Sequence, residues 1–337
     1  MHFKEEGMAK RILALMAACV VLMGLTWSRP KREPPPFAPV TGIYDLLPTN
    51  EIAAGEELAN PNVAGVSARF RWNSIQPNKL RTYWAAIDNV IDSAKSYGKK
   101  TIILVIPGIN TPNWVYSDGA QYVTFTYEGK NFKMPVPWDP IYLQKWCQFV
   151  TNLGKRYANN PDVISVQMAG VGKVGEMGIE VEGVDWTQYG YTDDVYISAW
   201  KTVIDTFRQA FPNKVTHLSI KEPFRGRTEA LLGVLNYCLT TYPKKIHIQA
   251  NDLRETGSDM SDYIRQAGEQ TYTGYEMFGG REWLDAITGD RMSAFQAGLA
   301  DGVVYMEVYQ GDLQDPTLND AVQFLAEGLA ANAAKQP

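Results

Sequence analysis

The sequence predicts a (β/α)8 barrel, an α/β fold in which eight parallel strands close into a cylinder inside a ring of helices. Short apolar segments alternate with longer amphipathic segments along the chain. Eight of the short segments fall in one stretch of roughly 300 residues, which is a normal length for this fold. No repeat and no internal linker divides that stretch, so one domain is expected.

The predicted strands are short and apolar, as buried parallel strands are. They cover residues 41–45, 64–72, 101–107, a run from 163, 215–223, 245–252, 271–279 and 302–310. A small hairpin is predicted within TYEGKNFKMP, in the long loop 108–140. The alternative fold is a doubly wound open sheet, which would need a glycine-rich phosphate turn after its first strand. The segment GIYDLLP found there is not such a turn.

The predicted helices lie between the strands. They cover residues 51–58, 83–97, 140–157, 193–211, 228–242, 259–270, 282–299 and 316–334. Gly98 and Pro212 follow directly after two of them, which is typical of helix ends. Residues 186–191 are predicted to form an aromatic loop.

The first 39 residues are predicted to precede the barrel. Residues 1–29 indicate a leader, because Lys10 and Arg11 stand before an apolar run, 12–25, as in a secretory signal. Residues 30–39 are a proline-rich linker, and 40–337 form the barrel. The leader could also remain as a signal anchor, tethering the chain through residues 12–27, or be processed as a lipoprotein at Cys19. The chain is therefore expected to be extracellular, periplasmic or membrane-anchored.

Composition narrows the classes of function. The net charge is −5 and no long basic run is present, which argues against a nucleic-acid partner. The three Cys and three His are scattered, so neither a disulfide framework nor a metal site is predicted, and no cofactor is expected. Aromatic residues make up 12% of the chain, enough to provide platforms for sugar rings.

Carboxylates follow several of the predicted strands. Glu176 lies in a glycine-rich loop after the fourth strand, Glu276 on the seventh and Glu307 on the eighth. The carboxyl ends of barrel strands converge on one face. Two carboxylates without a metal cluster or a Ser–His pair indicate cleavage of a glycosidic bond. Strand alternation places Arg69 and Arg71 on one face of the second strand, and Arg71 is predicted to hold the nucleophile ionised.

Three segments, GVSARFRWNSIQPN, YWAAIDNVIDSAKSYGKKTIILVIPG and TPNW, resemble the second-to-third strand region of retaining glycoside hydrolases of the β-galactosidase and cellulase type. The resemblance implies a (β/α)8 barrel with Glu176 as the acid/base, Glu276 as the nucleophile and Arg71 beside it. The family usually has Asn directly before the strand-four Glu, whereas this chain has Gly175. Glu307 stands where a strand-eight Trp is common, and it is a possible second carboxylate in place of Glu276.

Six further residues are candidates for binding substrate: Arg71, Trp72, Trp114, Trp186, Asn251 and Tyr309. The first hypothesis is an exported retaining glycoside hydrolase that acts on an oligo- or polysaccharide. The second is a non-catalytic carbohydrate-binding barrel of the cell envelope, which the missing Asn favours. A third is an envelope scaffold that only docks partners.

Overall fold

The computed structural model describes residues 37–53, 55–127, 129–279 and 287–336. The predicted leader, most of the linker and residues 282–286 of a predicted helix lie outside these ranges. The leader and the domain boundary therefore stay predictions. Within the described ranges, no helix combines the length and the apolar character that crossing a membrane requires.

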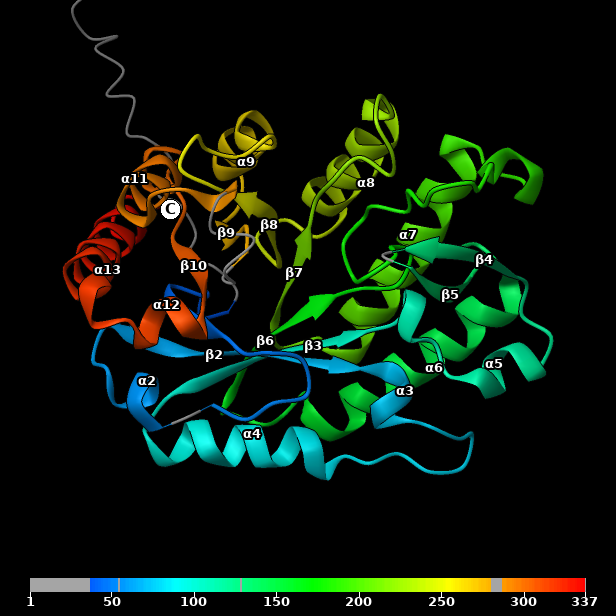
Figure 1. Cartoon of the computed structure of the whole chain (residues 1–337), viewed down its shortest axis with the longest axis horizontal. Helices are drawn as coiled ribbons and strands as arrows, with labels where there is room; N and C mark the ends of the chain where they lie inside the picture. Colours follow the sequence, from blue (N-terminus) through cyan, green and yellow to red (C-terminus); the bar gives the residue numbers. More distant parts are fainter. Residues whose placement is uncertain (1–36, 54, 128, 280–286, 337) are drawn as a thin grey trace, which may run out of the picture. The chain divides into compact units, whose positions relative to one another are not determined.

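Eight parallel strands form the predicted closed barrel, which is drawn with its surrounding helices in Figure 1. The strand order around the barrel is β1-β10-β9-β8-β7-β6-β3-β2. Their bounds are β1 Gly42–Leu46, β2 Val63–Arg71, β3 Lys100–Ile106, β6 Val163–Met168, β7 Val215–Ser219, β8 Ile246–Leu253, β9 Thr273–Met277 and β10 Tyr305–Tyr309. Each prediction of a strand is confirmed within a few residues.

Helices follow the strands in the predicted order. The described ones are α2 Gly55–Ala59, α3 Trp72–Ile75, α4 Ala85–Ser96, α5 Asn113–Ser117, α6 Pro140–Tyr157, α7 Asp193–Ala210, α8 Thr228–Thr241, α9 Ser261–Gly268, α11 Arg291–Ala300, α12 Gln310–Gln314 and α13 Asn319–Ala333. Short 3-10 turns cover Gly108–Asn110, Trp186–Tyr189 and Pro316–Leu318. Three short helices, α3, α5 and α12, were not predicted, and α3 and α12 begin directly after their strands.

The hairpin predicted in the long third loop is also present. Strand β4 (Tyr122–Tyr127) pairs antiparallel with β5 (Lys130–Pro135) in a separate two-stranded sheet. The hairpin is longer than predicted because its first strand extends back to Tyr122. Val123 and Phe125 of β4 are buried, whereas Tyr122, Thr124 and Thr126 are exposed, so one face of the hairpin packs inward.

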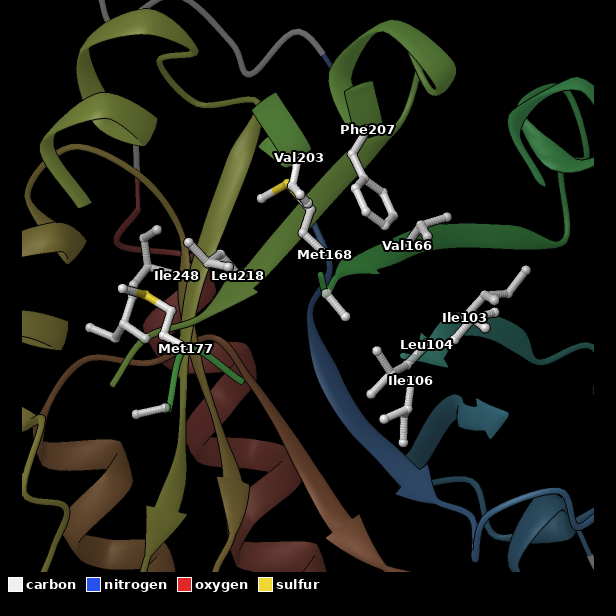
Figure 2. Close-up of a cluster of buried hydrophobic side chains, with 14 of the residues drawn as sticks. Ile103, Leu104, Ile106, Val166, Met168, Met177, Val203, Phe207, Leu218 and Ile248 are labelled. Carbon is white, nitrogen blue, oxygen red and sulfur yellow. The ribbon is translucent and has the colours of Figure 1, made fainter. Parts of the chain in front are cut away.

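Side chains alternate along the barrel strands between an apolar core, which faces the helices, and a set of buried polar groups. On β6, Val166 and Met168 are buried in the apolar cluster that also contains Val203 and Phe207 of α7, and Figure 2 shows these four residues. Strand residues of this set pack between the barrel and its helices, where burial of each side chain contributes about 1.5–3 kcal/mol.

The alternate positions hold buried polar groups that are linked by hydrogen bonds. Gln167 Nε2 donates to Ser219 Oγ at 2.7 Å, and Ser219 Oγ donates to Asn251 Oδ1 at 2.8 Å. Gln249 Nε2 lies 2.9 Å from both Asn251 Oδ1 and Glu307 Oε2. This network holds the carboxyl ends of β7 and β8 in a fixed relation, because unsatisfied buried polar groups are costly.

Candidate active site

A cleft of about 870 Å³ opens at the carboxyl ends of the barrel strands. Its lining comes from the loops after β3, β6, β7, β8 and β9 and from the β4–β5 hairpin. This is the face where the sequence places the candidate carboxylates, and where barrel enzymes carry their chemistry. Glu176 belongs to the lining, as do Phe125, Tyr127 and Phe132 of the hairpin.

The glycine-rich loop after β6 folds back tightly on itself to present Glu176. Lys173 N donates to Gly178 O at 2.8 Å. A Cβ on Gly172 would lie 1.3 Å from Glu176 O, so no side chain fits there. Gly175 has φ +107°, a conformation that Asn and other L-residues rarely adopt. The backbone therefore requires glycine at the position where the related family has Asn.

Glu176 is partly buried in this cleft. Its side chain is 27% exposed and its Oε2 lies 3.8 Å from Lys221 Nζ. Burial raises the pKa of Glu176 and the charge of Asp252 raises it further, whereas Lys221 and a hydrogen bond with Asn251 act in the opposite direction. A carboxyl whose pKa is raised by burial is suited to donate a proton near neutral pH.

Glu276 is held from two sides. Its Oε1 lies 3.7 Å from Arg69 Nη1 and accepts a hydrogen bond of 3.2 Å from Tyr309 Oη. Burial raises the pKa of Glu276, Arg69 opposes this rise, and the charges of Glu307 and Glu176 add to it. The charge of Glu176 therefore influences the ionisation of Glu276. Arg69 favours the ionised form of Glu276, which a nucleophile requires.

Glu307, the alternative candidate for the second carboxylate, lies away from the cleft surface. Its side chain is completely buried in the barrel interior. Ser67 Oγ donates to Oε1 at 2.7 Å and Gln249 Nε2 donates to Oε2 at 2.9 Å. His217 Nε2 lies 3.8 Å from Oε1. With no exposed surface and both oxygens engaged, Glu307 cannot contact a substrate in this structure.

The structure brings Arg69, and not Arg71, to Glu276. Arg71 is exposed at the end of β2, where its backbone N donates to Asn50 Oδ1 at 3.0 Å. The alternation that places the two arginines on one strand face is correct, but the strand ends at Arg71 and α3 begins. Arg69 also lies 5.5 Å from the centre of the Tyr309 ring, so both partners of Glu276 contact each other.

The three tryptophans predicted to bind substrate are mainly structural. Trp72 is fully buried, 5.0 Å from the Trp146 ring and 6.0 Å from the Trp114 ring. Trp114 is partly buried and its Nε1 donates to Gln76 O. Trp186 is 5% exposed and its Nε1 donates to Ile179 O at 3.1 Å. Trp72 packs inward at the start of α3, a short helix that was not predicted.

The other two candidates lie beside the carboxylates. Asn251 is hydrogen-bonded within the network below Glu176 and contributes to its pKa. Tyr309 contacts Glu276. Sequence reasoning overlooked the cleft-lining residues Phe125, Tyr127, Phe132, Lys173 and Lys221. The aromatic alternation of the hairpin was a usable signal for the first three.

Metal binding has no visible support in the part of the chain that the structure describes. No group of three or more His, Cys, Asp or Glu side chains there is arranged to hold an ion. His217 and His247 are buried, and burial lowers the pKa of each to about 3. They are neutral residues of the barrel interior.

The family comparison covers the first part of the barrel. Residues 54–171, about a third of the chain, match the family model of glycoside hydrolase family 42, described as beta-galactosidase. The match ends just before Glu176, so it does not reach either candidate carboxylate. A comparison with curated proteins finds no match.

Solved structures with a similar fold cover most of the chain. The catalytic domain of beta-amylase from Paenibacillus polymyxa has 10% identity and a TM-score of 0.56, covering 89% of this chain and all of that one. The endo-1,4-beta-mannanase from Rhizomucor miehei has 9% identity and a TM-score of 0.54, covering 88% and 96%. A GH5_18 protein from Streptomyces cattleya in complex with GlcNAc has 12% identity and a TM-score of 0.53, covering 82% and 73%. At these identities the likeness shows the fold.

The fold and the partial family match make the chain similar to one class of protein, the glycoside hydrolases with a (β/α)8 barrel. Within that class, the matched segment resembles the beta-galactosidase family. Enzymes of that class hydrolyse the bond between a sugar and its neighbour.

Proposed function

We propose that this chain is a retaining glycoside hydrolase that acts on an oligo- or polysaccharide. The proposal rests on one observation: two partly buried carboxyl groups have different neighbours. Burial raises the pKa of both carboxyls, that of Glu276 to about 8. Glu276 has a guanidinium and a phenol beside it, which favour its ionised form, whereas Glu176 lies in the open cleft. Such a division of roles is what acid catalysis and nucleophilic attack require.

In the proposed first step, Glu276 attacks the anomeric carbon and forms a covalent glycosyl-enzyme. Glu176 gives its proton to the oxygen of the departing sugar, so the leaving group departs as a neutral alcohol. In the second step, Glu176 removes a proton from water, and the water oxygen displaces Glu276 from the anomeric carbon. Two inversions give net retention of configuration. Arg69 and Tyr309 orient Glu276 throughout.

The test uses the full-length chain with Glu176→Gln and Glu276→Gln. Glu276→Gln is expected to lower kcat by roughly 10⁴-fold or more on every substrate. Glu176→Gln is expected to lower it by about 10²–10⁴-fold on natural glycosides, and much less on an aryl glycoside whose leaving group needs no proton. NMR of the first-formed product should show the substrate's anomeric configuration. An inverted product would contradict the retaining mechanism.

A non-catalytic carbohydrate-binding barrel is the second candidate. It is favoured by Gly175, which stands where the glycoside hydrolases that the sequence resembles usually have Asn. Gly175 has a positive φ and no side chain that could contact a sugar. This candidate predicts that sugars bind while the wild type and both Gln variants show the same absence of turnover.

We also propose that the chain is exported. The support is the charged and apolar pattern of the leader, Lys10 to residue 25. Cell fractionation with and without residues 1–29 tests it, and the presence of both forms in the cytoplasm would contradict it.

A further inference from the structure

Cationic side chains line the cleft that holds Glu176, together with the carboxylates of Glu180, Glu222 and Asp259. Lys173 from the loop after β6, and Lys221 and Arg225 from the loop after β7, all line it. Lys221 makes a long ion pair with Glu176, at 3.8 Å. Within the described ranges, Lys173 and Arg225 have no carboxylate at ion-pair distance, although both belong to a cleft that contains acids.

Two of those acids are already bound within their own loops. The Glu222 carboxylate accepts hydrogen bonds from Gly226 N at 2.8 Å and Thr228 Oγ1 at 2.6 Å. Asp259 Oδ2 lies 2.8 Å from Arg254 Nη2. These two carboxylates therefore already have partners of their own.

Lys173 is in an unfavourable position for a charged group. Its side chain is partly buried, and burial lowers its pKa, with a further lowering by the charge of Lys221. Glu176 and Glu180 act in the opposite direction. Its Nζ lies 5.3 Å from the centre of the Tyr127 ring. A partly buried cation without a close counter-ion is costly, and an anion bound in the cleft would offset that cost.

The same cations work against the proposed role of Glu176. Lys221 and Lys173 both lower the pKa of Glu176, although an acid catalyst must hold its proton. A negative group on the substrate, placed against the two lysines, would neutralise them and restore the protonated form of Glu176. The two lysines are therefore compatible with Glu176 as the acid catalyst if the substrate supplies a negative charge.

The hairpin supplies a surface for the sugar ring that carries this group. The rings of Phe125 and Phe132 are stacked, with their centres 5.8 Å apart and 22° between their planes. The centre of the Tyr127 ring lies 6.4 Å from that of Phe132. All three line the cleft together with Lys173 and Glu176. Aromatic faces bind the apolar faces of sugar rings.

We propose that the substrate is an anionic glycan. A carboxylate or sulfate on the departing sugar, the one that Glu176 protonates, is bound by Lys173 and Lys221 beside the aromatic residues of the hairpin. This inference rests on the proposed function, because it assigns the substrate class of the same cleft. Carboxylates and sulfates share the recognition chemistry of a planar or tetrahedral oxyanion with ammonium groups.

The experiment compares three oligosaccharide sets of equal length with the full-length chain: neutral, uronate-bearing and sulfated. Wild type is expected to hydrolyse at least one anionic set with kcat/KM about tenfold or more above the neutral set. The double variant Lys173→Met/Lys221→Met should lose that preference, with KM for the anionic set raised about tenfold. Lys155→Met/Lys335→Met, which changes two exposed lysines outside the cleft lining, is the charge-matched control and should keep it. Added NaCl should raise KM only for the anionic set.

The uronate and sulfate sets identify which anion is used. The inference is overturned if neutral glycans are hydrolysed best and the double variant does not lose activity, a result that leaves the proposed function standing. If no set is hydrolysed, the proposed function fails, and calorimetric binding of the same sets decides the inference. Preferential binding of an anionic set that the double variant loses then supports it, and equal or absent binding overturns it.

Discussion

Glu276 and Glu307 are register partners on the neighbouring strands β9 and β10, yet they lie in different surroundings. Glu276 keeps 10% of its side chain exposed and contacts Arg69 and Tyr309. Glu307 is fully buried and bonded to Ser67 and Gln249. One register level therefore holds a carboxylate at the rim of the barrel and another sealed inside it.

The first prediction separates these two carboxyls by Glu307→Gln. The negative charge of Glu307 raises the pKa of Glu276, so its removal should lower that pKa. Glu276 must be ionised to attack, and the acidic limb of the kcat/KM profile should therefore move to lower pH. Activity at the optimum should stay within about tenfold of the wild type, because the amide keeps the shape of the side chain. A loss as large as that of Glu276→Gln would assign the nucleophile to Glu307.

The second prediction concerns the arginine beside Glu276. Removal of one partner of a buried ion pair costs about 3–5 kcal/mol, and this pair is partly exposed, so Arg69→Met should lower kcat/KM by roughly a hundredfold. Its acidic limb should move to higher pH, because Arg69 holds the pKa of Glu276 down.

Arg71→Met is the matched control for Arg69→Met, since both arginines belong to β2. Arg71 is exposed, so its kcat/KM should stay within about twofold of the wild type. If Arg71→Met were the more damaging change, the assignment of Arg69 as the positioning residue would be wrong.

The third prediction tests whether Trp72 is a core residue. Trp72→Ala should lower the free energy of unfolding by about 3–5 kcal/mol, measured by urea denaturation, with KM unchanged in the folded fraction. Tyr127→Ala is the contrasting variant, because Tyr127 is 53% exposed on the cleft. It should raise KM and alter stability by less than about 1 kcal/mol. The opposite pattern would return Trp72 to the substrate site.

The fourth prediction is a pH dependence of stability. Burial, and then the charge of His217, lower the pKa of His247 from 6.5 to about 3. Below pH 6.5 the unfolded chain therefore binds a proton that the folded chain does not, so stability is lost as the pH falls from 6.5 towards 3. For His247→Phe, the unfolding free energy relative to wild type should rise by up to about 1.4 kcal/mol per pH unit in this range.

Urea denaturation at pH 7, 6 and 5 measures this difference. The control is Thr273→Val, a buried substitution on β9 that removes no titrating group. The Thr273 hydroxyl has no hydrogen-bond partner in the described structure. The effect of this substitution on stability should be the same at all three pH values. A His247→Phe difference that also stays constant would show that His247 does not change its protonation on unfolding.

The strand and helix order followed from the sequence because its signals are local. Apolar runs such as 101–107, and helix stops such as Gly98, depend on residues within one or two turns of each other. The placement of Glu176 after a strand and of Glu276 on one follows from the same local patterns. The barrel then brings such positions to one face whatever the loops do.

The tertiary structure alone decided which of several equivalent residues belongs to the candidate active site. Arg69 and Arg71 share a strand face, and Glu276 and Glu307 share a register level, so local patterns cannot separate them. Their exposure depends on where each strand ends and on which neighbour fills the space beside it. The same holds for Trp72, which a short helix turns into the core, and for the hairpin aromatics, which reach the cleft only because a loop of the third strand folds over it.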